Sequence, residues 1–190
     1  MKDCVLFAKL LVVVSMLATG SSKAAFHLWN LSEVFSNSTG TLQFIEFETT
    51  FGSQQFVAGH SVTVSNIGSS LSNMFTLSSN LPGNSANRRF LLGTAGLQAA
   101  GGPVPDYIIP DNFLFTAGGS INFFGTNSGT YTALPTDGTL SRTWGGGNQI
   151  NSPTNFANQV GTVTVPEPRS VLLLLSGGLL CAGFRRARGA

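Results

Sequence analysis

Lysine and cysteine are absent from the long middle part of this 190-residue chain, residues 25–165. Without cysteine, this part can form no disulfide, and it has neither a thiolate nucleophile nor a cysteine-based metal site. It holds three arginines and six carboxylates, so its formal charge is 3 − 6 = −3, although the whole chain reads +2. Because a surface that tracks phosphates needs clustered Lys and Arg, we expect no nucleic-acid partner.

The first 24 residues have the organisation of a secretory signal peptide. Two lysines lie near the start, an apolar run over Leu10–Leu17 follows, and small residues come last. Ser22 and Ala24 suit the two small-residue pockets of signal peptidase, which predicts cleavage before Ala25. The alternative is an uncleaved N-terminal anchor, although the apolar core is short for a membrane span of about 20 residues.

Residues 166–190 show similar features in the opposite order. The elements are Pro166-Glu167-Pro168, the apolar stretch Val171–Phe184, and the basic residues Arg185, Arg186 and Arg188. As a helix, the apolar stretch would be about 21 Å long, which is short for a hydrocarbon layer of about 30 Å. Arginines stay on the cytoplasmic side of a membrane, so the tripeptide would emerge on the outer face. Prolines on both sides of the glutamate keep it extended and accessible.

Together with Val165, this series resembles the PEP-CTERM sorting signal of Gram-negative bacteria. The resemblance covers about 25 residues. It implies that exosortase, a membrane transpeptidase-like enzyme, recognises Pro166-Glu167-Pro168. It also implies export to the cell surface, the outer membrane or the extracellular matrix, commonly in association with exopolysaccharide. A plain transmembrane tail is the alternative interpretation.

The middle part has the pattern of an all-β domain. Thirteen of the 15 phenylalanines lie in it, in short runs separated by Gly, Asn, Ser and Pro. We expect a two-sheet sandwich, either Ig-like or jelly-roll, between the signal peptide and the C-terminal sorting helix. The expected strands span residues 26–35, 41–51, 56–65, 74–77, 89–93, 107–109, 113–116, 120–124, 139–144 and 161–165.

A second resemblance concerns the start of this domain. Residues 26–35 and 42–47, joined by a glycine-containing turn, resemble the opening hairpin of a set of secreted bacterial proteins of unknown function. Residues 134–138 and 151–156 are similar to later stretches of that set. The same opening is similar to the first two strands of lamin-tail-like Ig sandwiches. The resemblance supports the fold and implies no catalytic residues.

No coherent catalytic set stands out in residues 25–165. A Gly-x-Ser-x-Gly elbow is missing, and His60 is expected on the apolar face of its strand, where histidines are usually packed. Glu46 and Glu48 share one strand face at about 7 Å, a spacing that a glycosidase could use, with Glu33 on the neighbouring strand. The alternatives are a solvated acidic patch, or Glu46 held by backbone donors.

Two binding hypotheses remain. Residues 106–111 and 136–138 are acidic loops that leave a structural calcium open, although neither has the carboxylate density of a calcium loop. Trp144, beside the polar loop 145–149, could stack on a sugar, with Tyr131 as a second platform. The alternative for Trp144 is to cap the core of the sandwich.

The sequence therefore favours a non-enzymatic, exported protein with a structural or adhesive role linked to exopolysaccharide or biofilm. Signal peptidase and exosortase are the expected processing partners, the C-terminal helix holds the precursor in the membrane, and exopolysaccharide is the expected ligand. No cofactor and no metal are expected. A carbohydrate-binding module is the alternative function, and a secreted hydrolase is a third.

Overall fold

The computed structural model describes residues 26–165. The predicted signal peptide with Ser22 and Ala24, the predicted sorting tripeptide at 166–168, the apolar segment after it and the arginine cluster at 185–188 all lie outside the described residues. Within 26–165 no segment is helical, so this part offers no helix that could cross a membrane.

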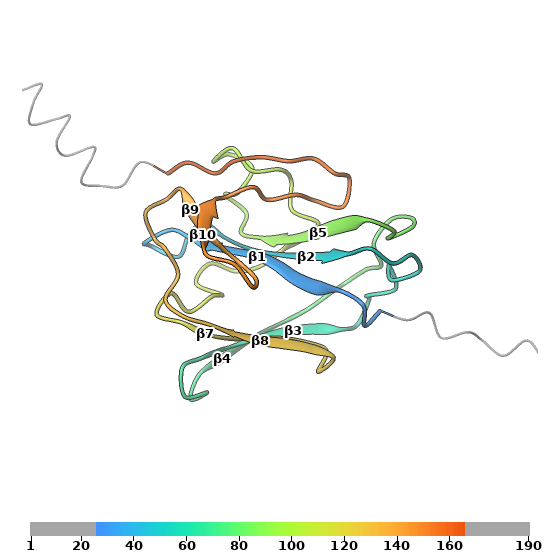
Figure 1. Ribbon diagram of the computed structural model, residues 1–190, viewed down its shortest axis with the longest axis horizontal. Coiled ribbons are helices and arrows are strands. Elements are labelled where there is room, and N and C mark those ends of the chain that lie inside the picture. The colour runs from blue at the N-terminus through green and yellow to red at the C-terminus, as the bar shows by residue number, and fades with distance from the viewer. Residues whose placement is uncertain (1–25, 166–190) are drawn as a thin grey trace, which may run out of the picture.

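The described chain forms ten strands in two facing sheets (Figure 1). The strands are β1 (Asn30–Ser36), β2 (Gln43–Thr49), β3 (Ser61–Asn66), β4 (Ser72–Thr76), β5 (Arg88–Gly93), β6 (Tyr107–Ile108), β7 (Gly119–Phe123), β8 (Asn127–Tyr131), β9 (Leu140–Thr143) and β10 (Asn148–Ile150). One sheet has the order β10-β9-β1-β2-β5-β6 and the other β4-β3-β7-β8. All neighbouring pairs are antiparallel except β5 and β6.

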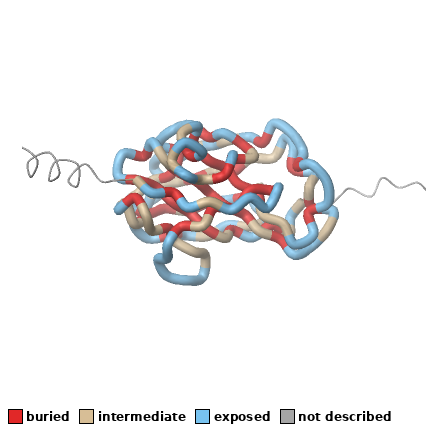
Figure 2. The backbone as a smooth tube through the Cα atoms, turned by 90° about the horizontal axis from the view of Figure 1, so that it is seen from above, coloured by how far each residue is buried: buried red, intermediate tan, exposed pale blue. Residues whose placement is uncertain are grey.

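The main hydrophobic core lies between the two sheets. Alternate residues of each strand point to it, as period-two patterning requires: Ile45 and Phe47 come from β2, and Val62 and Val64 come from β3. Figure 2 shows this buried interior along most of the length of the domain. The all-β, two-sheet prediction is therefore confirmed.

A second, smaller core covers the opposite face of the six-stranded sheet. Phe35, Phe44 and Leu91 project from β1, β2 and β5, and Leu97 and Val163 pack on them from segments outside the strands. In Figure 1 the last part of the described chain, in orange and red, runs over this face. The central strands of the six-stranded sheet, β1, β2 and β5, are thus covered on both sides.

Several strand predictions were wrong. Residues 113–116 and 161–165 are not strands: Leu114 is bonded through its N–H and carbonyl to the Gln43 side chain, and Val163 likewise to the Asn151 side chain. Buried amide side chains thus replace strand partners for these apolar segments. Conversely, β8 and β10 were not predicted, because their polar sequences have the composition of turns.

Candidate functional site

The outer face of the six-stranded sheet carries carboxylates under the returning C-terminal chain. Glu33 of β1 and Glu46 of β2 are opposite each other in the strand register and both are buried. Asp106, partly buried, lies next to β5 and accepts a hydrogen bond from the backbone N–H of Leu91 at 2.8 Å. Buried carboxylates need partners that satisfy their oxygens.

Residues 151–156, here called the strap, supply those partners at every second position. The backbone N–H of Ser152 donates to Glu33 at 2.9 Å, that of Thr154 to Glu46 at 2.7 Å, and that of Phe156 to Asp106 at 2.9 Å. An extended chain points alternate N–H groups to the same side, so one short segment can bind a row of carboxylates. The strap is therefore attached to the sheet through three acidic side chains.

Ser32 is the extra residue of a β-bulge in β1, between Leu31 and Glu33. The extra residue shifts the alternation of the strand by one position, so that Glu33 points outward and Val34 points into the main core. It also brings the Ser32 hydroxyl to Glu46 Oε1 at 2.8 Å. Glu33 receives a similar hydroxyl from Ser141 of β9 at 2.5 Å. Neighbouring strands and the strap thus surround both glutamates.

Burial raises the pKa of Glu46 from 4.5 to about 7. The hydrogen bond from Ser32, the charge of Arg89 at 3.3 Å and the N–H of Thr154 each lower this pKa, while the nearby Glu33 raises it. Burial prevails because Glu46 has no exposed surface, whereas the side chain of Arg89 is 40 % exposed and its charge is screened by water. Burial also raises the pKa of Asp106.

Glu46 and Glu48 share a face, as predicted, but they have different environments. Glu48 is half-exposed and binds Arg89 at 2.9 Å, while Glu46 lies beneath the strap. The interpretation that a backbone donor holds Glu46 is confirmed. A glycosidase pair needs both carboxyl groups at the substrate, and the strap covers one of these two.

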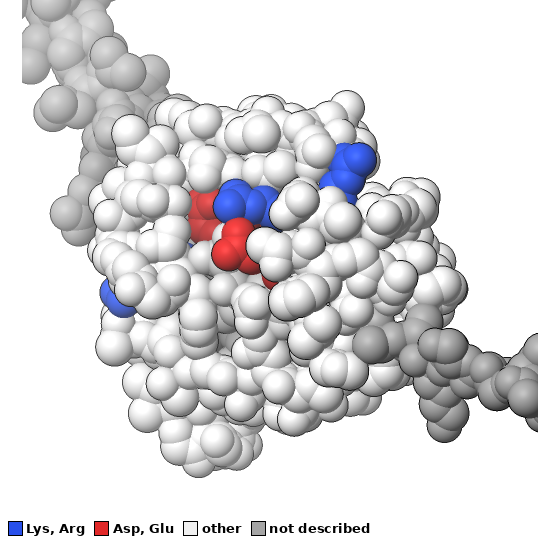
Figure 3. Space-filling model, turned by 45° about the vertical axis from the view of Figure 1, so that its right-hand side comes forward, with Lys and Arg blue, Asp and Glu red and all other residues white. Residues whose placement is uncertain are grey.

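A polar cleft of about 290 Å³ lies beside these carboxylates, at the ends of β1, β2 and β5. Its lining consists of Asn30, Glu48, Thr49, Thr50, Asn87, Arg88 and Arg89. Figure 3 shows basic and acidic side chains gathered on one face of the molecule, with a mostly neutral surface around them. Both arginine and carboxylate side chains occur among the residues that line this cleft.

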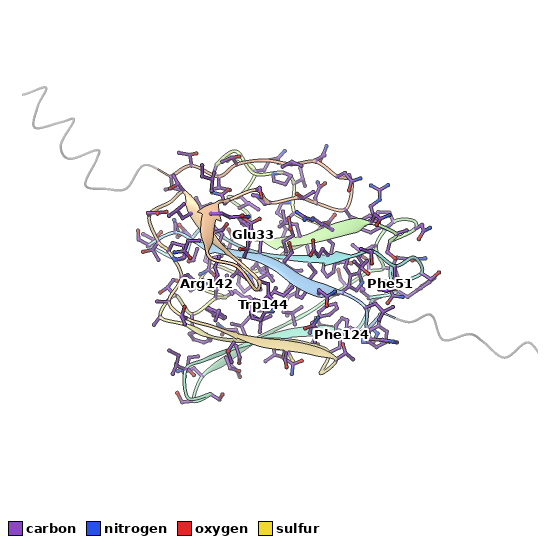
Figure 4. The ribbon with its side chains drawn as sticks, in the orientation of Figure 1. Glu33, Phe51, Phe124, Arg142 and Trp144 are labelled. Carbon is purple, nitrogen blue, oxygen red and sulfur yellow. The ribbon has the colours of Figure 1, made fainter. Side chains whose placement is uncertain are left out.

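The aromatic platform prediction is wrong for Tyr131. Tyr131 is 5 % exposed, and its hydroxyl accepts a hydrogen bond from the N–H of Phe115, so too little of the ring is accessible for a sugar to stack on it. Trp144 is partly buried and packs on the main core, so close to Gly129 that a Cβ there would overlap the indole. Figure 4 shows Trp144 between β1 and β8. Its position fits the core-capping alternative.

His60 is packed, as predicted, but it precedes β3 and is not part of it. Its ring packs against those of Phe26 and Phe124, with centroid distances of 3.6 and 4.2 Å, and the two phenylalanine rings also contact each other. Phe124 has a φ of 57°, in the left-handed region that bulky side chains rarely adopt. The chain bends there, and this bend presents the Phe124 ring to His60.

Each acidic loop has a carboxylate that accepts hydrogen bonds from backbone N–H groups. Desolvation raises the pKa of Asp137, but the hydrogen bonds that it accepts from the N–H groups of Thr139 and Leu140 outweigh this and lower it, and these bonds confirm the turn interpretation. Asp106 binds two backbone N–H groups, as described above. Residues 26–165 contain no group of three or more His, Asp or Glu side chains placed to hold a metal ion.

The strap and the Arg88 cleft were both missed by sequence reasoning. Residues 151–156, Asn-Ser-Pro-Thr-Asn-Phe, show no alternation of polar and apolar side chains that would indicate an extended segment, and Pro153 with the Asn and Ser residues around it is typical of turns. Comparison with protein-family models, with curated proteins and with solved structures finds no match to this chain.

Proposed function

We propose that this is an exported, non-enzymatic protein that exosortase sorts to the cell surface or the extracellular matrix, where it adheres to exopolysaccharide. The signal peptide and the PEP-CTERM-like tail support the export route. The domain itself supports adhesion through its surface chemistry. The assignment of the domain to the Ig-like or jelly-roll class of sandwiches is part of the same proposal.

The observation that carries the adhesive role is the outer face of the four-stranded sheet. We call it the hydroxyl face, and its side chains are Ser61, Thr63, Ser65, Ser72, Met74, Thr76, Ser120, Asn122, Ser128 and Thr130. None of them is charged, and all but Met74 carry a hydroxyl or an amide. Such groups both donate and accept hydrogen bonds, as sugar hydroxyls do.

Strand register arranges these groups in rows. Ser72, Ser65, Ser120 and Thr130 lie opposite one another across the four strands, and a second row lies two residues along each strand. Neighbouring strands are about 4.8 Å apart, so apart from Met74 the rows form a regularly spaced array of hydrogen-bonding groups. A hollow of about 480 Å³ lies at one end of the face, and its lining is mostly apolar, with Ile67 and Tyr131 beside Ser120 and Thr130. An extended, neutral polysaccharide chain can contact such a surface over several sugar units.

Truncation of this face is expected to weaken adhesion. The double variant Ser120→Ala/Thr130→Ala removes two adjacent hydroxyls, and at about 1 kcal/mol for each hydrogen bond the affinity falls about tenfold or more. A pull-down with exopolysaccharide from the organism that produces the protein measures this loss. Asn148→Ala/Gln149→Ala, on the exposed strand β10 of the other sheet, is the matched control and retains binding. Equal binding by both variants and the wild type would contradict the role of the hydroxyl face.

A further inference from the structure

The polar cleft at the end of β5 contains an arginine whose charge is not neutralised. Arg89 binds both Glu46 and Glu48, but among residues 26–165 no carboxylate lies within ion-pair distance of Arg88. The register pairs Arg88 with Thr49, and both line the cleft. One positive charge of this otherwise acidic domain is thus available to a ligand.

The strap holds Arg88 in position. Nη1 of Arg88 donates to the carbonyl of Phe156 at 3.3 Å, and its guanidinium carbon lies 5.8 Å from the centroid of the Phe156 ring. The side chain is half-buried, so its conformation is restricted before any ligand arrives. A guanidinium has five N–H donors, of which this contact uses one. The remaining donors can form the two parallel hydrogen bonds with which arginine binds a carboxylate.

Uncharged groups at the cleft rim suit the hydroxyls of a sugar. Asn87, immediately before Arg88, has a φ of 54°, a left-handed conformation that costs energy for any residue except glycine. Its amide and the hydroxyl of Thr50 are exposed at the rim and form no hydrogen bond with the other described residues. With Asn30 they place amide and hydroxyl groups around the guanidinium.

We propose that this cleft binds one acidic sugar unit, with Arg88 pairing with the sugar carboxylate and Asn87 and Thr50 bonding its hydroxyls. The volume of about 290 Å³ is near the lower end of ligand pockets, which suits a single sugar ring. The inference rests on the proposed function, because it gives the class of saccharide that the adhesive protein recognises. It uses a different surface, the six-stranded sheet side, and not the hydroxyl face.

Titration calorimetry on the protein purified from its host tests the assignment. Oligogalacturonate is the probe, the corresponding neutral galactose oligomer is the first control ligand, and inorganic phosphate is the second. We expect the acidic oligomer to bind at least tenfold more tightly than the neutral one, with affinity falling as salt is added. Equal affinities for the two oligomers would overturn the proposal, and so would preferential binding of phosphate.

Three variants separate recognition from folding. Arg88→Gln is expected to lose at least tenfold in affinity for oligogalacturonate, while Arg142→Gln, on β9 away from the cleft, retains it. Asn87→Gly removes the amide and relieves the left-handed strain, so it weakens binding without loss of thermal stability. Wild-type affinity in both cleft variants would overturn the proposal.

The outcomes also separate this inference from the proposed function. If only the cleft variants lose affinity for the acidic oligomer, and only Ser120→Ala/Thr130→Ala detaches the protein from whole exopolysaccharide, both surfaces act as proposed. If the cleft variants bind oligogalacturonate as tightly as the wild type, while Ser120→Ala/Thr130→Ala still loses binding to whole exopolysaccharide, only the acidic-sugar site is refuted.

Discussion

Raising the pH from 4.5 to 7 is expected to remove about 3 kcal/mol from the free energy of unfolding of the wild-type protein through Glu46 alone. Glu46 has its ordinary pKa in the unfolded chain and a pKa of about 7 in the fold. Between these two values the folded state holds more protons than the unfolded state, so stability falls as pH rises. The full contribution of protonated Glu46 is present below pH 4.5 and is lost above about pH 7.

Other charges face Glu46 and set the size of this effect. Arg89 on β5 favours the ionised form, and Glu33 on β1 opposes it. The strap contributes only the neutral N–H of Thr154. Asp106 also has a raised pKa, so it adds a loss of the same sign. Because several groups titrate, the Glu46 contribution is the difference between the wild type and a variant without this carboxyl group.

Glu46→Gln is the variant that isolates the contribution of Glu46 to the pH dependence of stability. The glutamine amide keeps an oxygen to accept the N–H of Thr154 but does not titrate. Between pH 4.5 and 7 we therefore expect the free energy of unfolding of this variant to fall by about 3 kcal/mol less than that of the wild type. Urea unfolding at a series of pH values measures the difference. Glu48→Gln, at a half-exposed carboxylate on the same strand, is the control and keeps the wild-type profile. Parallel profiles for the wild type and Glu46→Gln would refute the buried, proton-binding role.

Gly119→Ala is expected to lower the free energy of unfolding by about 2–3 kcal/mol. A Cβ at this position of β7 would overlap the carbonyl oxygen of Ser65 on β3 and lie 3.1 Å from its carbonyl carbon. Backbone atoms cannot rotate away as a side chain can, so the central pair of the four-stranded sheet would have to separate. Asn66, the register partner of Gly119, lies at the same contact.

Thermal and urea unfolding of Gly119→Ala measure this cost. Gly147→Ala is the matched control, because a Cβ there meets nothing within 4 Å and the glycine φ is not positive. We expect its stability to stay within about 0.5 kcal/mol of the wild type. A similar small change in Gly119→Ala would mean that β3 and β7 are not as closely paired as the structure shows.

Side-chain alternation is the part of the fold that could be predicted. It assigns Ile45 and Phe47 to one face of β2, and Phe44 and Glu46 to the other, because a strand has a period of two. Alternation cannot show that the face of β2 with Phe44 and Glu46 is covered as well. That depends on the strap, which returns from more than 100 residues further along the chain to bind Glu33 and Glu46.

The cleft could not be predicted for a related reason. Asn30, Thr49 and Arg88 come together through the register of β1, β2 and β5, and no local pattern encodes that register. The prediction of Tyr131 as a sugar platform failed because an aromatic residue beside polar ones looks exposed. In the fold, β8 turns that ring into the main core.

The intact mass of the mature protein, purified from a host with active exosortase, tests the proposed export and sorting most directly. We expect an N-terminus at Ala25 and a C-terminus that no longer includes the apolar segment Val171–Phe184 or the arginines after it. A host without exosortase is the control, and there the segment is retained. A mature chain that extends through Ala190 in the presence of active exosortase would contradict the sorting proposal.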